Sequence, residues 1–150
     1  MRVVVQRVSK ASVLVGNKKI SSINKGLLVF VGIEINDTEK DILWLANKVT
    51  SLRIFSDNKG VMNKSVIDID AEVLVISQFT LHARTKKGNR PSYIKALKGK
   101  EAIFFYDKFL ELLISKIGEK VFSGHFGANM QIELINDGPV TILIDSKNKE

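Results

Sequence analysis

The chain has 150 residues, of which 45% are hydrophobic and 26% are charged, with a formal net charge of +7 and no cysteine. The lack of cysteine excludes disulfides and thiolate catalysis, and no apolar run is long enough to span a bilayer. Residues 1–150 are therefore expected to form one domain of a soluble, cytoplasmic protein that has no membrane partner.

The positive charge is concentrated in one segment. Seven basic residues and no acidic residue lie between Arg84 and Lys100. A segment of this kind is expected to face the phosphate backbone of a nucleic acid. A solvated loop rich in lysine would have the same composition, so charge alone leaves both interpretations open.

The first half of the chain predicts strands followed by a helix. β-Branched residues favour strands at Arg2–Val8 and Ala11–Val15, with a turn at Gly16-Asn17. The continuous apolar run Gly26–Ile33 predicts a strand covered on both faces. Capping residues at Asn36–Thr38 then predict a helix. Its apolar face would be formed by Ile42, Leu45, Ala46, Val49 and Leu52, and a short strand would follow over Leu52–Phe55.

The second half adds strands and one more helix. Glu72–Ser77 is a second buried strand, predicted to run on through Leu81. A helix is predicted over Glu101–Ile117, with Gly118 as its C-terminal cap, and a hairpin over Met130–Asp145 closes the chain. This order favours an α/β fold in which a curled, mixed but largely antiparallel sheet forms a barrel-like core covered by two helices.

The turn of the predicted hairpin is Asn136–Thr141. Asn, Asp and Gly tolerate positive φ and are typical of hairpin turns, but Pro139 has no N–H to donate to the returning strand. The Gly138-Pro139 bond precedes a proline, and a cis peptide costs little only at such bonds. The turn is either an ordinary hairpin or a device that holds backbone atoms in a fixed orientation.

Side chains able to do chemistry are few. The only histidines, His82 and His125, lie far apart with no second nitrogen or sulfur ligand nearby, so neither a metal nor a cofactor is expected. The best local cluster is Ser77–His82. On an extended strand Thr80 and His82 would share one face and could form a nucleophile–base pair.

Two alternatives to that pair remain open. Thr80 could be a strand former and His82 a surface residue, since no acidic residue visibly orients the histidine. Backbone amides at the end of the strand could instead supply the chemistry, because main-chain donors stabilise an oxyanion.

Several segments resemble D-aminoacyl-tRNA deacylases, in the order of that family and over nearly the whole chain. The two most specific contain Ser77-Gln78-Phe79-Thr80 and Gly138-Pro139-Val140-Thr141. The others are Met1–Val8, Leu52–Phe55, Met62–Ser65, Lys87–Ser92 and Phe126–Met130. Arg84 and Asn129 depart from the family pattern, since acidic residues are common at both positions.

The resemblance implies an enzyme that hydrolyses the ester between a D-amino acid and the 3′ adenosine of tRNA, and that also acts on mischarged glycyl-tRNA. It implies a homodimer with active sites at the subunit interface. The Gly138-Pro139 bond would be cis, and its tip would enter the partner's pocket. There the Gly138 and Pro139 carbonyls would face the substrate amino group and exclude an L side chain, while Arg7 holds the tip.

The resemblance also implies roles for the remaining site residues. Ser77, Gln78, Phe79 and Thr80 would form the catalytic wall, where amides near Phe79 and Thr80 meet the oxyanion and Thr80 is first a positioning residue. The attacking group would be water, assisted by the ribose 2′-hydroxyl of the substrate. Met130 would line the adenosine pocket, and the tRNA backbone would be contacted by Lys86, Lys87 and Arg90.

Two other functions are compatible with the same residues. One is a non-catalytic dimeric RNA-binding module, in which the basic segment binds and the hairpin only dimerises. The other is a small-molecule esterase that uses Thr80 and His82.

Overall fold

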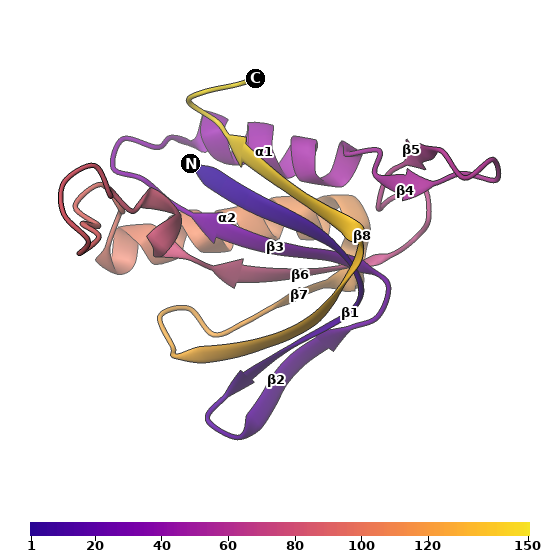
Figure 1. Cartoon of the computed structure of the whole chain (residues 1–150), viewed down its shortest axis with the longest axis horizontal. Coiled ribbons are helices and arrows are strands. Elements are labelled where there is room, and N and C mark those ends of the chain that lie inside the picture. The colour runs from indigo at the N-terminus through magenta and orange to yellow at the C-terminus, as the bar shows by residue number, and fades with distance from the viewer.

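The computed structural model describes residues 1–150 as a mixed sheet with two helices, α1 (Glu39–Ser51) and α2 (Gly99–Ile117), on one of its faces (Figure 1). Six strands form the main sheet: β1 (Arg2–Val15), β2 (Lys18–Ile23), β3 (Gly26–Gly32), β6 (Glu72–Ser77), β7 (Val121–Ser123) and β8 (Met130–Asp145). A separate pair consists of β4 (Phe55–Ser56) and β5 (Met62–Lys64). Two short 3₁₀ helices are η1 (Phe79–His82) and η2 (Gly118–Lys120).

The long strand β1 organises the sheet. Its first half pairs with β3 and its second half with β2, while β8 runs antiparallel to it from end to end. The β3–β6 and β6–β7 pairs are parallel. Because β1 and β8 bend together, the sheet curls, as Figure 1 shows. The predicted curled mixed sheet covered by two helices is confirmed.

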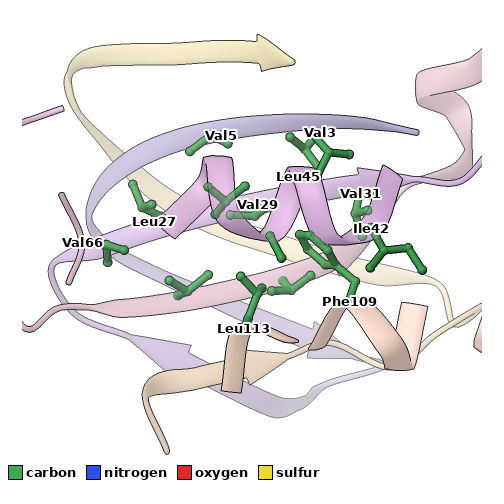
Figure 2. Packing of buried hydrophobic residues seen from close by; sticks show 14 of the residues in the cluster. Val3, Val5, Leu27, Val29, Val31, Ile42, Leu45, Val66, Phe109 and Leu113 are labelled. Atoms are coloured by element: carbon green, nitrogen blue, oxygen red, sulfur yellow. The ribbon is translucent and has the colours of Figure 1, made fainter. Parts of the chain in front are cut away.

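The main core lies between the sheet and the two helices. Val3 and Val5 of β1 and the alternate residues of β3 meet α1 and α2 there, as Figure 2 shows. Phe109 and Leu113 of α2 are fully buried in this layer. A second, smaller cluster covers the other face of β3 and β6, which explains the continuous apolar run of β3.

Both helices lie where their capping residues predict them. Thr38 is the N-cap of α1, and its N–H donates to the Asp41 carboxylate at 2.9 Å. Gly118 is the C-cap of α2, with φ of +64°. Neither helix is long and apolar enough to cross a membrane.

Two predicted elements are wrong in detail. Leu52 is the C-cap of α1 and not a strand residue, so β4 begins only at Phe55. The strand β6 ends at Ser77, and the chain turns into η1 instead of continuing through Leu81. Gln78 has φ of −143° and ψ of 79°, which breaks the strand geometry there.

The predicted closing hairpin is also wrong. The two halves of β8 pair with the same strand, β1, and run in the same direction. Gln6 pairs with Thr141 and Val8 with Asn136, so residues 137–140 lie opposite the single residue Arg7. The Gly-Pro segment is therefore a bulge of several residues in one continuous strand, and residues 137–140 are called the Gly138 bulge below.

Candidate active site

The turn at the end of β6 presents backbone donors. The Gln78 N–H donates to Val31 O of β3 at 2.7 Å, which fixes the start of the turn. The 3₁₀ helix that follows has no internal acceptor for the N–H groups of its first residues, Phe79 and Thr80. Residues 77–80, the wall segment, thus offer two adjacent amides of the kind that stabilise an oxyanion.

A pocket of about 220 Å³ lies against the wall segment. One side is formed by Ser77, Gln78 and Phe79, and the other by the chain from Gly127 to Met130 together with Ile132. Met130 is thus brought beside the wall segment, although 50 residues separate them in sequence. The Phe79 side chain is 54% exposed at this pocket and contacts Tyr93 edge-on, with ring centroids 5.1 Å apart.

The hydroxyl of Thr80 is engaged within the wall segment. Gln78 Nε2 donates to Thr80 Oγ1 at 2.5 Å. This bond orients the Gln78 and Thr80 side chains toward each other. The hydrogen-bond partner of the Thr80 hydroxyl is therefore Gln78 and not a histidine. Its geometry suits a positioning residue.

The nucleophile–base pair that Thr80 and His82 could form on an extended strand is not formed. His82 is 2% exposed, and neither of its ring nitrogens has a hydrogen-bond partner. Burial lowers the pKa of His82 below its usual value of 6.5. Because the chain enters η1 instead of extending, the histidine points into the protein and cannot serve as a base for Thr80.

The Gly138 bulge is closed by the side chain of Asn136. The Asn136 Oδ1 accepts a hydrogen bond from Val140 N–H at 2.8 Å, and its Nδ2 donates to Val140 O at 3.2 Å. The amide side chain therefore replaces the backbone pairing that the bulge interrupts. Within the bulge, the Gly138-Pro139 peptide bond is cis.

Arg7 fastens the bulge to the rest of the molecule. Its Nε donates to Asp137 O at 2.9 Å, and its Nη1 donates to Ile54 O at 2.6 Å. The Arg7 side chain is only 12% exposed, and it also lies 3.4 Å from the Asp137 carboxylate. The guanidinium thus ties one end of the bulge to the segment between α1 and β4.

The wall segment and the Gly138 bulge lie at opposite ends of the chain's sheet. Arg7, beside the bulge, pairs with Leu27 at one end of β3, whereas Gln78 bonds to Val31 near the other end. Four residues of strand correspond to roughly 13 Å. In Figure 1, β8 bends at the right of the view, far from the end of β6 at the left. Within one chain, the wall segment and the Gly138 bulge are therefore not brought together.

The predicted nucleic-acid contacts lie on one exposed loop. Arg84 and Ser92 exchange backbone hydrogen bonds of 2.8 and 3.1 Å and close the loop between them. Lys86, Lys87 and Arg90 are exposed on this loop, and none of them is in an ion pair. Because Tyr93 follows the loop and contacts Phe79, the loop adjoins the wall segment.

Sequence reasoning did not assign a role to Asn136 or Arg2, although both make well-defined bonds at the site. Asn136 stands at the start of the Gly-Pro segment, where its amide can mimic a peptide group. Arg2 donates to Leu81 O at 3.0 Å. No sequence signal predicts the Arg2 contact, because it depends on the turn after β6.

No group of three or more His, Asp or Glu side chains is placed to hold a metal ion. The polar groups of the wall segment are its backbone amides, the amide side chain of Gln78 and the hydroxyls of Ser77 and Thr80.

Comparison with known proteins gives a consistent result. The family model described as D-Tyr-tRNA(Tyr) deacylase matches residues 4–145. A protein of Parabacteroides distasonis is 60% identical and one of Flavobacterium psychrophilum is 59% identical, each over 150 residues and the full length of both chains. Both are named D-aminoacyl-tRNA deacylase.

Two solved structures share this architecture. The c-Myc DNA Unwinding Element Binding Protein is 44% identical, with a TM-score of 0.92 over 97% of this chain and 98% of that one. A probable eukaryotic D-amino acid tRNA deacylase has a TM-score of 0.82 over 95% and 97% of the two chains. At 17% identity, the second structure supports the fold alone.

Proposed function

Since the chain belongs to the D-Tyr-tRNA(Tyr) deacylase family, we propose that it removes D-amino acids from tRNA by hydrolysing the ester to the 3′ adenosine. It is a hydrolase of aminoacyl-tRNA ester bonds. The observation that supports its mechanism is the turn after β6, where the amides of Phe79 and Thr80 have no acceptor within η1 and Phe79 lines an open pocket. We place the protein in the cytoplasm, where charged tRNA is its substrate.

In the proposed reaction, water attacks the ester carbonyl carbon, and the carbonyl oxygen becomes an oxyanion held by the Phe79 and Thr80 amides. The bond to the ribose 3′ oxygen then breaks, and that oxygen takes up a proton. The 2′-hydroxyl of the substrate assists the water, since the wall segment contains no free base. The hydrogen bond from Gln78 holds Thr80 in a positioning role.

The Gly138 bulge is proposed to supply chiral selection. Its backbone carbonyls would face the α-amino group of the substrate and leave no room for an L side chain. Arg7 and Asn136 support this role, because their bonds fix the bulge at both of its ends. Glycine has no side chain to exclude, so we extend the proposal to mischarged glycyl-tRNA.

The complete site is proposed to form in a homodimer, where the bulge of one subunit enters the pocket of the other. The separation of the two halves within one chain supports this arrangement. The strand β8 supports it as well, because none of its 16 residues is buried and only β1 pairs with it. An edge strand of this length is ordinarily covered by another element or chain.

The tRNA itself is proposed to lie along the basic loop. Lys86, Lys87 and Arg90 would contact phosphates, which contributes affinity without sequence preference. Met130 would line the adenosine pocket, where it adjoins the wall segment. Arg84 and Asn129 lie beside these surfaces and add positive charge or remove negative charge relative to the family pattern.

Mixing two inactive variants tests the shared site. Gly138→Val should inactivate the bulge and Gln78→Ala the wall segment, and each homodimer should hydrolyse D-tyrosyl-tRNA slowly. After subunit exchange, a mixed dimer has one site with both halves intact, so activity should return. Wild-type protein that leaves D-tyrosyl-tRNA intact contradicts the reaction and favours the RNA-binding module. Active wild type without recovery in the mixture contradicts only the shared site.

A further inference from the structure

The turn that presents the Phe79 and Thr80 amides receives one side-chain hydrogen bond from another element. Arg2 Nη1 of β1 donates to Leu81 O at 3.0 Å. The other side-chain bond of the turn joins Gln78 to Thr80 and is internal. The carbonyl end of η1 is therefore held from outside by Arg2.

The same guanidinium also holds the end of β8. Arg2 Nε donates to the Asp145 carboxylate at 2.7 Å, and the two residues are paired in the β1–β8 ladder. The Arg2 side chain is partly exposed and Asp145 less so, at 37% and 16%. Arg2 thus bridges the turn after β6 to the strand that carries the Gly138 bulge.

The turn packs closely on the strand β3 and has little freedom to move toward it. A Cβ on Gly32 of β3 would lie 2.9 Å from Gln78 O and 3.0 Å from Leu81 Cβ, so η1 sits directly on the backbone of β3. His82 fills the buried space behind it. Because no other side chain from outside the turn donates a hydrogen bond to it, the position of Leu81 O depends on Arg2.

We propose that Arg2 is a positioning residue of the reaction: its bridge between Leu81 O and Asp145 sets the orientation of the Phe79 and Thr80 amides. An oxyanion donor acts only within a narrow distance range, close to 3 Å from the developing charge. The planar fork of arginine reaches two acceptors at once, which the single ammonium of lysine does not reproduce. This inference rests on the proposed hydrolysis.

The test compares Arg2→Lys and Asp145→Asn with wild type in single-turnover hydrolysis of D-tyrosyl-tRNA. Arg2→Lys should lower the rate constant between about tenfold and a hundredfold, the cost of a small misplacement of catalytic groups. The protein concentration for half-maximal rate should stay unchanged, because Arg2 is not among the residues that line the pocket. Asp145→Asn should lower the rate less, since the bond to Leu81 remains. Lys108→Ala, which removes an exposed pair with Glu111, is the matched control.

Amide hydrogen exchange at Leu81 and Ala83 gives a second readout that needs no activity. These N–H groups bond to Gln78 O at 3.2 Å and Thr80 O at 3.0 Å, so they report on the turn itself. The exchange rates of both amides should be higher in Arg2→Lys than in wild type, and they should be unchanged in Lys108→Ala. An unaltered rate constant, a loss confined to the half-maximal concentration, or unaltered exchange overturns the inference. If wild type is inactive, the proposed function fails and the exchange data alone decide whether Arg2 positions the turn.

Discussion

Gly138 has a backbone conformation that excludes other residues. Its φ is +143°, a region in which L side chains are strained. A Cβ there would lie 2.9 Å from Val140 N and 3.1 Å from Arg7 Nη2. Val140 N and the guanidinium that carries Nη2 both make hydrogen bonds that hold the bulge, so neither can move away without loosening it.

Replacing Gly138 by alanine should therefore cost roughly 1–3 kcal/mol of local strain and lower the hydrolysis of D-tyrosyl-tRNA. Gly60→Ala is the control, because Gly60 also has positive φ, at +78°, but nothing lies within 4 Å of its Cβ position. The control should be slightly less stable and fully active in thermal melts and hydrolysis assays. Equal activity of both variants would show that crowding at Gly138 is not what matters.

His82 makes the stability of the folded protein depend on pH. Burial favours the neutral ring and lowers its pKa. The positive charges of the nearby N-terminal ammonium and Arg2 also lower the pKa of His82, whereas the negative charge of Glu34 raises it. The unfolded chain therefore binds the proton more readily. The contribution of His82 is fully present above pH 6.5 and is lost as the pH falls through the lowered folded pKa.

The melting temperature of wild type should accordingly fall from pH 7 towards pH 5. The melting temperature of His82→Gln should fall less over the same range. His125→Gln, at an exposed histidine, should follow the wild-type curve. A His82 variant whose melting temperature falls as steeply as that of wild type would place the pH dependence elsewhere.

At the scale of elements, the Gly138 bulge is an interruption of one strand that a side chain repairs. Asn136 bonds to both polar groups of the Val140 backbone, and its Nδ2 also donates to Thr141 Oγ1 at 3.0 Å. The bulge projects from β8 while the ladder with β1 resumes on either side. The geometry of the bulge therefore depends on Asn136 as well as on Arg7.

Asn136→Ala should remove these bonds, at a cost of roughly 1–3 kcal/mol for the groups left unpaired. We expect slower hydrolysis of D-tyrosyl-tRNA and a lower ratio of D to L hydrolysis, because the bulge loses its fixed shape. Asn148→Ala makes the same change in the exposed C-terminal segment and should alter neither quantity. An Asn136 variant with the wild-type ratio would show that Arg7 alone fixes the bulge.

The sequence predicts most elements but not the two local geometries on which the site depends. Periodicity and capping residues locate β3, β6, α1 and α2 because burial and caps are local signals. The same signals give a hairpin for Met130–Asp145, since a bulge and a turn use the same Asn, Asp and Gly residues. They also extend β6 past Ser77, because the packing of the turn on Gly32 is a tertiary contact. The proposed roles of the Ser77–Thr80 and Gly138-Pro139 segments rest on their resemblance to a family.

At the scale of the whole molecule, the face of the sheet opposite the helices carries an apolar row that reaches the β8 edge. Val4 pairs with Phe30 on one side and Leu143 on the other, so the three side chains share a face. Leu143 is 66% exposed, and Val4 and Phe30 are only partly buried. An apolar row beside the unpaired edge of β8 fits an interface with a second copy.

Leu143→Asp should therefore separate the subunits and abolish hydrolysis while leaving the fold of each chain intact. Sedimentation should give twice the chain mass of 16.8 kDa for wild type and a single chain for the variant. Ile114→Asp, on the exposed side of α2, should remain a dimer and stay active. A monomeric Leu143 variant with full activity would contradict a site shared between subunits.

The most direct measurement is the hydrolysis of matched D-tyrosyl-tRNA and L-tyrosyl-tRNA by the purified wild-type protein. A backbone filter at the Gly138 bulge, opposite the amides of Phe79 and Thr80, predicts rapid release of the D-amino acid with the L-ester left intact. Equal hydrolysis of the two esters, or hydrolysis of neither, would contradict the account.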